Sequence, residues 1–264
     1  MNKNIINKYV KLLLIIINNV DPIDKCIGRP IIYSYKYCLK IIFDMLYTGI
    51  SWRLMEKLLK IRIDAVKKRF NKWISLEVFN KAYNSLFKLY KHKYNIKNLY
   101  IDSTVIGNSS GSLKFGYNIK IKNKKSIKIT AIVDDNKVPH LLKVTPSNPH
   151  DSKIMEDIIN DNNINNGKTI NLIGDKGYIK STEYINNINK KYNINLITPD
   201  RKNTINKKLL TDNHIHLKKR YIVENFFCLL KKTYKRINII NDKLIDNYNN
   251  YLYLIQGLIL SQYI

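Results

Sequence analysis

The chain has 264 residues, of which 45% are hydrophobic and 11% aromatic, so it has enough apolar material for a core and is not globally disordered. Its 46 lysines and arginines against 20 acidic residues give a formal net charge of +26, which indicates an anionic partner such as nucleic acid or a membrane surface. Three scattered cysteines exclude a disulfide framework, and the apolar run at residues 12–17 is too short to span a membrane.

The positive charge has two interpretations. An AT-rich coding sequence favours lysine, isoleucine and asparagine whatever the protein does, whereas DNA binding requires lysine and arginine for their charge. Double-stranded DNA is the predicted partner, and the charge supports it without deciding it. Because the cysteines suit a reducing interior and the apolar stretches do not suit a membrane, we expect an intracellular, DNA-associated protein whose compartment depends on its host.

The first 97 residues have a helical pattern. Helices are predicted over residues 37–47, ending near Gly49, over 51–59, capped by Ser51, and over 64–73, capped by Asp64. The second and third have helix-turn-helix proportions, although an ordinary helical hairpin has the same appearance in sequence. We therefore expect a helical N-terminal domain over residues 1–97 that either reads DNA with this pair or packs it as a plain hairpin. The candidate DNA contacts are Arg53, Lys67, Lys68 and Arg69.

Beyond residue 97, strands alternate with helices. Strands are predicted over residues 98–104, 127–133, 138–144, 169–173 and 194–198, with helices over 151–159, from 181, over 218–236 and from 242 to the end. Three antiparallel strands followed by alternating helices and strands predict an α/β fold, a mixed sheet flanked by helices. This is also the element order of the ribonuclease-H-like fold. We assign residues 98–264 to one such domain.

Three carboxylates lie where this sheet could bring them together. Asp102 lies on the first strand, Asp175 comes directly after the strand at 169–173, and Glu224 lies within the helix at 218–236. A carboxylate in an apolar strand or helix is costly unless something compensates it, and a divalent metal is a natural partner. Taken singly, Asp102 also fits an ordinary strand end and Asp175 a turn ahead of Gly177. Spacing alone leaves both interpretations open.

The predicted helix over residues 218–236 places the third acid between two cations. At about 100° per residue, Arg220, Glu224 and Lys231 lie within roughly 40° of one another. This edge suits a metal ligand flanked by cations that bind a phosphate chain. An ordinary surface ion pair between Arg220 and Glu224, four residues apart, explains the first two equally well.

Five sequence blocks follow one another in a fixed order. They are Leu46-Tyr-Thr-Gly-Ile-Ser-Trp-Arg, preceded by Gly28-Arg-Pro; Ile101-Asp-Ser-Thr; the stretch 124–134 with Val138-Pro and His150-Asp151; Gly174-Asp-Lys-Gly-Tyr; and residues 220–231, with three residues between Arg and Glu and six between Glu and Lys. Together they resemble the DDE transposases of insertion sequences, in particular the group around insertion sequences four and five. Two departures are Leu217, where that group often has tyrosine, and a short cation-rich tail after Lys231.

The resemblance covers nearly the whole chain and implies a function. It implies a ribonuclease-H-like catalytic domain that cleaves DNA at the ends of its own mobile element and transfers the strands to target DNA. Asp102, Asp175 and Glu224 would then be catalytic and hold two Mg²⁺ ions, for which Mn²⁺ would substitute. Arg220 and Lys231 would bind the DNA phosphates. We also expect a homodimer when the protein is bound to DNA.

Other functions stay open on the same sequence. One is a transposase-derived DNA-binding protein that has lost catalysis, although the presence of all three acids argues against lost chemistry. A second is a structure-selective nuclease of the ribonuclease-H-like fold, which cuts without joining. A third is a basic nucleic-acid packaging protein, which would tolerate changes at all three acids. Inverted repeats flanking the gene would favour the transposase.

Overall fold

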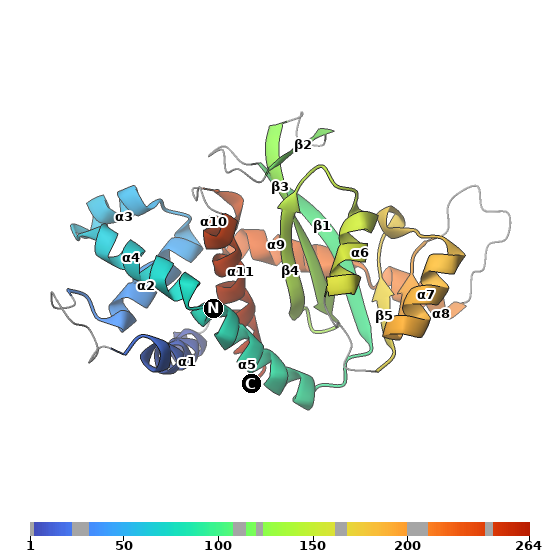
Figure 1. The fold of residues 1–264 in the computed structure, drawn as a ribbon, viewed down its shortest axis with the longest axis horizontal. Coiled ribbons are helices and arrows are strands. Elements are labelled where there is room, and N and C mark those ends of the chain that lie inside the picture. Colours follow the sequence, from blue (N-terminus) through green and yellow to red (C-terminus); the bar gives the residue numbers. More distant parts are fainter. Residues whose placement is uncertain are drawn as a thin grey trace. The chain divides into compact units, whose positions relative to one another are not determined.

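The computed structural model describes residues 3–22, 32–107, 115–119, 124–161, 168–199, 211–240 and 245–264. Its described residues form two compact units: unit 1, from residues 1–94 and 230–264, and unit 2, from residues 95–107 and 114–229. Unit 1 is helical, and unit 2 contains the sheet (Figure 1). The break after Tyr94 lies close to the predicted boundary at residue 97, whereas the C-terminal helices belong to unit 1. The functional division into residues 1–97 and 98–264 stays a prediction.

The helices of unit 1 begin and end largely where their capping residues predict. Ser51 accepts a hydrogen bond from the Leu54 N–H, and Gly49 ends the preceding helix with a φ of 73°, a left-handed conformation that glycine adopts without strain. The prediction that Asp64 caps the third helix is wrong, because that helix begins at Ile63, and Asp64 lies within its first turn. The described helices are α1 (Lys3–Val20), α2 (Tyr35–Thr48), α3 (Trp52–Leu59), α4 (Ile63–Ser75), α5 (Val78–Lys93), α10 (Lys235–Asn238) and α11 (Ile245–Leu260).

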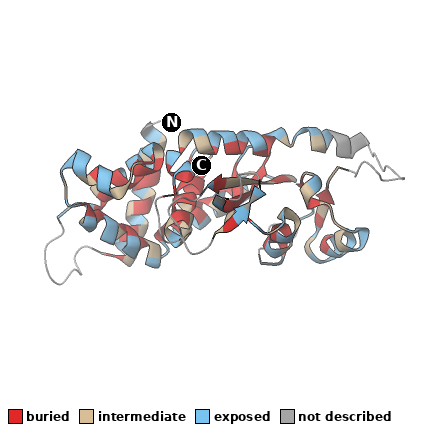
Figure 2. Cartoon of the chain, turned by 90° about the horizontal axis from the view of Figure 1, so that it is seen from above, coloured by how far each residue is buried: buried red, intermediate tan, exposed pale blue. Residues whose placement is uncertain are grey.

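The core of unit 1 is rich in aromatic side chains. Trp73, Phe70 and Tyr251 are fully buried, and the Phe70 and Tyr251 rings lie 5.1 Å apart, which joins α4 to α11. Figure 2 shows the buried residues on the inner sides of these helices. In the ranges that the structure describes, no helix is both long and apolar enough to cross a membrane.

A buried carboxylate ties the end of α1 to α4. Asp21 is 3% exposed and accepts hydrogen bonds from Lys72 Nζ at 2.6 Å and from Arg69 at 3.3 Å, while its backbone carbonyl accepts one from the Tyr35 hydroxyl. Burial works to raise the pKa of Asp21, but the hydrogen bond and charge of Lys72, with the charge of Arg69, outweigh burial and hold that pKa below its ordinary value. The ionised carboxylate therefore stabilises unit 1.

Replacing this carboxylate by an amide, Asp21→Asn, should lower the free energy of unfolding at pH 7 by about 1–3 kcal/mol. Because folding lowers the pKa of Asp21, its contribution is present above about pH 4 and is lost as the pH falls through the folded-state pKa. Urea unfolding at pH 7 and pH 3 measures both effects. Asp64→Asn, at an exposed position, is the control. Equal stability of Asp21→Asn and the wild type at pH 7 would contradict this account.

Six strands among the described residues of unit 2 form one mixed sheet, with β1 near its centre. The strand β1 pairs antiparallel with β3 and parallel with β5, β5 pairs parallel with β6, and β4 pairs antiparallel with the far side of β3. The bounds are β1 (Asn98–Gly107), β2 (Gly116–Asn118), β3 (Lys124–Asp134), β4 (Pro139–Pro146), β5 (Ile170–Ile173) and β6 (Ile194–Ile197). The five predicted strands are confirmed, and the three-residue β2 is additional.

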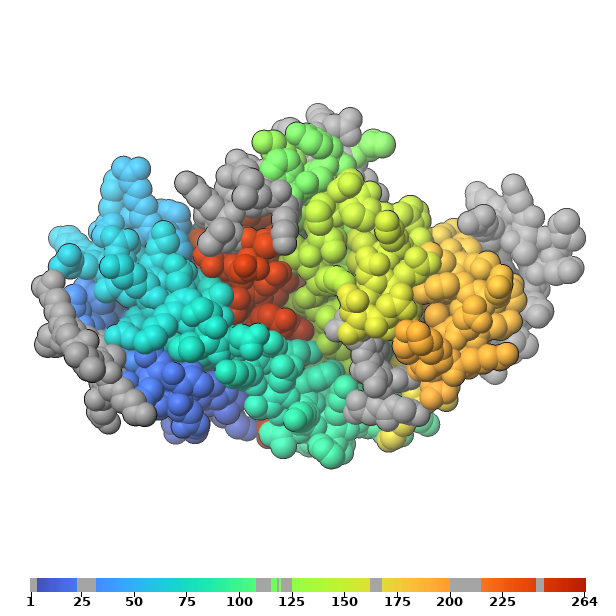
Figure 3. Space-filling view, viewed as in Figure 1, coloured from blue at the N-terminus to red at the C-terminus, as the bar shows by residue number. Residues whose placement is uncertain are grey.

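The order β4-β3-β1-β5-β6 is that of the ribonuclease-H-like fold, so the predicted fold class is confirmed. Two helices, α6 (Asp151–Asp161) and α7 (Thr182–Tyr192), contribute to a core on one face of this sheet, where Leu99 and Ile101 of β1 are buried with Ile158 and Ile188. Figure 3 shows the outer surfaces of α6 and α7 in yellow-green and orange. Because side chains alternate along a strand, Tyr100 and Asp102 belong to the opposite face.

An amide ladder crosses the three parallel strands on that opposite face. Asn195 donates from Nδ2 to Asn171 Oδ1 at 3.1 Å, and Asn171 donates in turn to Asn98 Oδ1 at 3.0 Å. Asn98 donates to a carboxylate oxygen of Asp135, which also accepts the Tyr100 hydroxyl at 2.9 Å. Asn171 and Asn98 each accept one hydrogen bond and donate another, and the ladder ends on the Asp135 carboxylate, so these polar side chains are satisfied within the sheet.

The single helix predicted over residues 218–236 is wrong. The chain forms α8 (Thr211–Lys218), a turn at residues 219–220, α9 (Tyr221–Thr233) and then α10. Tyr234 separates the last two with a φ of −109° and a ψ of 84°. The break turns Arg236 inward, where its buried guanidinium donates to the Ile50 carbonyl at 3.0 Å. Helical periodicity could not predict the break after α9, because it assigns an arginine to the solvent-exposed side of a helix, whereas Arg236 is buried.

Candidate active site

Asp102 lies on β1 and is held by its own backbone. Its Oδ1 accepts the Ser103 N–H at 2.8 Å, and the residue pairs in register with Ala131 of β3. The side chain is half-buried, on the sheet face opposite the α6–α7 core. The prediction that Asp102 lies on the first strand of the sheet is confirmed.

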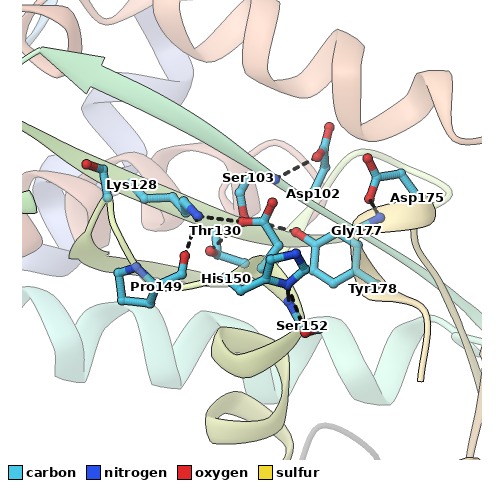
Figure 4. A network of polar contacts seen from close by, with 12 residues as sticks. Asp102, Ser103, Lys128, Thr130, Pro149, His150, Ser152, Asp175, Gly177 and Tyr178 are labelled. Atoms are coloured by element: carbon cyan, nitrogen blue, oxygen red, sulfur yellow. Dashed lines mark hydrogen bonds and ion pairs between the residues drawn. The ribbon is translucent and has the colours of Figure 1, made fainter. Parts of the chain in front are cut away.

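Asp175 follows β5 and caps the short 3₁₀ helix η3 (Lys176–Tyr178), where its Oδ1 accepts the Gly177 N–H at 2.8 Å. The parallel ladder pairs Tyr100 of β1 with Ile173 of β5. Asp102 and Asp175 each lie two residues beyond that pair, and parallel strands end at the same edge. The sheet therefore brings these two predicted site residues to one edge (Figure 4).

The pKa of Asp102 reflects burial and the other acids at this edge. Burial raises the pKa of the Asp102 carboxyl, and the negative charges of Asp175 and Asp151 raise it further. The Ser103 N–H and the positive charge of Arg220 act in the opposite direction but do not outweigh these causes. Asp102 is therefore a carboxylate whose charge the surrounding protein leaves only partly compensated.

Asp151 is a further acidic residue at this edge, and it was not among the candidate site residues predicted from the sequence. Its Oδ1 accepts from the buried Lys128 Nζ at 2.7 Å, and Lys128 also donates to the Pro149 carbonyl at 2.7 Å. The imidazole of His150, rather than Asp151, accepts the Ser152 N–H in the first turn of α6. The sequence signal for this ion pair was the lysine within the apolar strand β3, because a buried lysine needs an acidic partner.

Glu224 does not join the two aspartates as closely. It lies on α9, is 58% exposed and pairs with Arg220 across 3.3 Å, the spacing of an ordinary helix-surface ion pair. Arg220 links it to the site, because the charge of Arg220 acts on Asp102. Among the described residues, no three His, Cys, Asp or Glu side chains are grouped closely enough to hold a metal ion. Lys231 lies on the part of α9 that belongs to unit 1.

The cations predicted to contact DNA from the N-terminal helices differ in their surroundings. Arg53 on α3 and Lys67 and Lys68 on α4 are exposed. Arg69 instead faces the buried Asp21 and lies 5.2 Å from the centre of the Tyr35 ring. The structure thus gives Arg69 a packing partner, and contact of any of the four with DNA stays a prediction.

Residues 95–249 match the family model described as Transposase DDE domain, which is more than half of the chain. The chain belongs to this family. It is also similar to a piggyBac transposase in a cryo-EM structure of a synaptic complex with hairpin DNA, with a TM-score of 0.36 and 14% sequence identity. That alignment covers 78% of this chain and 43% of the piggyBac chain, so this chain spans less than half of its length. None of the curated proteins matches the chain.

Family membership confirms that the chain is related to enzymes of DNA transposition and recombination, which cut and transfer DNA strands. The DDE domains of this family generally use divalent metal ions. The assignment to the group around insertion sequences four and five is a finer statement and stays a prediction.

Replacing the Asp102 carboxyl by an amide, Asp102→Asn, should stabilise the protein at pH 7 by on the order of 1 kcal/mol, because it removes a charge that burial and the neighbouring acids disfavour. The folded-state pKa of Asp102 is raised, so its contribution to stability is greatest at low pH and is lost as the pH rises through that pKa. The gain of the variant should therefore shrink towards pH 4. Thermal unfolding in EDTA measures it, with exposed Asp157→Asn on α6 as the control. A lower melting temperature for Asp102→Asn would refute this expectation.

Proposed function

We propose that this chain is a transposase that cleaves DNA at the ends of its own mobile element and joins those ends to target DNA, in a reaction that requires divalent metal. Membership of the Transposase DDE domain family supports strand transfer in general. The observation that carries the proposal is the pair Asp102 and Asp175 at one edge of the sheet, where the charge of Asp175 raises the pKa of Asp102.

Asp102, Asp175 and Glu224 would hold the metal, which we take to be two Mg²⁺ ions that Mn²⁺ can replace. Carboxylate oxygens are the ligands that Mg²⁺ prefers. The fit is supported by the partly uncompensated charge of Asp102, which a bound cation would stabilise. When bound, such ions activate the attacking oxygen and neutralise the leaving oxygen of a phosphoryl displacement.

Arg220 and Lys231 would bind the phosphates of the substrate strand. Arg220 is 24% exposed, and its guanidinium contacts Glu224, so a phosphate oxygen arriving beside it would compete with that carboxylate for the same hydrogen-bond donors. Lys231 follows Glu224 by seven residues, about two helical turns along α9. Arginine suits bidentate phosphate binding, whereas lysine supplies a point charge.

The α3–α4 pair of unit 1 would bind the element ends. Its exposed cations, Arg53, Lys67 and Lys68, support contact with the phosphate backbone. Arg69 follows Lys68 on α4 and would contribute to this surface while paired with Asp21 at 3.3 Å. The protein would act as a homodimer when bound to DNA, since two element ends have to be cut and joined together.

Cleavage and joining are tested on labelled duplex DNA that carries the sequences flanking the gene, with Mg²⁺, Mn²⁺ or EDTA. The wild type should nick the ends and form joined products with either metal and not with EDTA. Asp175→Asn and Glu224→Gln keep side-chain shape but remove a carboxylate charge, and each should lower the cleavage rate at least about 100-fold. Gel analysis of the labelled strands measures both steps.

The matched control is Asp157→Asn, an exposed carboxyl-to-amide change on α6 that should leave the cleavage rate unchanged. Cleavage without joined products would refute the transposase and identify a ribonuclease-H-like nuclease instead. Tight DNA binding without cleavage, equal in the wild type and both variants, would identify a transposase-derived DNA-binding protein. Wild-type rates in Asp175→Asn and Glu224→Gln would refute the assignment of the acids.

Removing two exposed charges, Lys67→Ala with Lys68→Ala, should weaken binding to element-end duplexes. It should also reduce the dependence of log Kd on log salt concentration by about 2, because each lysine that neutralises a phosphate adds about 1 to that slope. The control removes two exposed lysines of α7, Lys190→Ala with Lys191→Ala. Fluorescence anisotropy at several salt concentrations measures both variants. Equally weakened binding in the two would show general charge attraction and remove the α3–α4 pair from the DNA-binding surface.

A further inference from the structure

A buried tyrosine connects the segments that carry the two aspartates. The Tyr178 hydroxyl lies 2.9 Å from Ser103 Oγ, and Ser103 Oγ also lies 2.9 Å from Thr130 Oγ1 of β3. Ser103 is the residue after Asp102, and Tyr178 ends the 3₁₀ helix that Asp175 caps. Figure 4 shows this row of hydroxyl groups running from β3 through β1 to η3, next to both carboxylates.

The Tyr178 ring also packs against Gly174, the residue before Asp175. A Cβ atom added to Gly174 would lie 2.9 Å from Tyr178 Cδ2, closer than real Cβ contacts come, and 3.0 Å from Tyr178 Cγ. The ring therefore packs directly on the Gly174 backbone, and the absence of a side chain there makes this contact possible. Tyr178 thus contacts both aspartate-bearing segments, one through its ring and one through its hydroxyl.

This contact lies where the strand ladder stops. The pairing of β1 with β5 extends from Asn98 and Asn171 to Tyr100 and Ile173, two residues short of the aspartates. Beyond that pair, backbone hydrogen bonds of the ladder no longer set the distance between the two segments. The Ser103–Tyr178 hydrogen bond spans them at the level of the carboxylates.

We propose that Tyr178 is a positioning residue, which fixes the spacing of Asp102 and Asp175 through its hydrogen bond to Ser103 and its packing on Gly174. This inference rests on the proposed function, since it assumes that the two aspartates share a metal. Outer groups that orient metal ligands affect metal affinity and activity as a rule. If Tyr178 only filled the α6–α7 core, its ring would be sufficient and its hydroxyl would have no effect on metal binding. Removing the hydroxyl therefore distinguishes the two roles.

The test compares Tyr178→Phe with the wild type in Mn²⁺ binding, followed by electron paramagnetic resonance of free Mn²⁺, and in cleavage of element-end DNA. The variant keeps the ring and loses the hydroxyl. Its Kd for Mn²⁺ should rise about 10-fold, and cleavage should need correspondingly more metal. Tyr192→Phe is the matched control, because it removes a hydroxyl that donates to Asn160 at 3.2 Å elsewhere in unit 2.

Ser103→Ala removes the other partner of the same hydrogen bond. Circular dichroism checks that Tyr178→Phe is folded, and Ser103→Ala provides the test if it is not. If the hydrogen bond is responsible, the two effects are not additive, and the double variant binds Mn²⁺ no more weakly than the weaker-binding single variant. Additive losses of affinity, or wild-type affinity in Tyr178→Phe, would overturn the proposal.

Failure of the function and failure of this inference give different results. Wild-type protein that binds Mn²⁺ but does not cleave DNA, with weaker binding in Tyr178→Phe, would refute the transposase and support the positioning role. Cleavage by the wild type, with the same metal dependence in Tyr178→Phe, would support the transposase and refute the positioning role. Absence of Mn²⁺ binding by the wild type would overturn both.

Discussion

The parallel pairing of β1 with β5 is the constraint on which the candidate site depends. Two strands that run in the same direction end at the same edge of a sheet, so residues at matching positions beyond the last pair, Tyr100 and Ile173, have to lie near each other. Asp102 and Asp175 occupy those positions. The loop that follows β5 then closes into η3, and the start of α6 brings Asp151 to the same edge. A local hydrogen-bond register thereby creates a concentration of negative charge.

That concentration opposes folding, and the surroundings of the acids show how the protein tolerates it. Asp151 is compensated by Lys128 in a largely buried ion pair, and Glu224 by Arg220 at the surface. The charged form of Asp102 is stabilised by the Ser103 N–H and by the charge of Arg220, but burial and the neighbouring acids outweigh both, so its pKa is raised. The proposed metal site would therefore need the same negative charge that the fold disfavours.

The sequence predicted the fold class, the strands and the positions of two acids, because apolar strands and capping residues depend on local chemistry. It could not predict what depends on distant partners. The ion pair of Lys128 with Asp151 joins a lysine within an apolar strand to the start of a helix, and local sequence patterns do not reveal that pairing. The helix break at Tyr234 depends on Arg236, which reaches the Ile50 carbonyl 186 residues away in the chain. Glu224 lies within a helix, as predicted, but helical periodicity says nothing about its distance from the two aspartates.

The amide ladder of Asn98, Asn171 and Asn195 favours one register of the parallel strands. The adjacent strands Ile170–Ile173 and Ile194–Ile197 share the sequence Ile-Asn-Leu-Ile, and a one-residue change in their pairing would move every side chain to the opposite face of the sheet. A shift by one residue would bury each amide among isoleucines and leucines without its partner, which is costly. The same shift of β5 against β1 would turn Asp175 away from Asp102. Asparagines remote from the acids thus protect the geometry of the site against misalignment during folding.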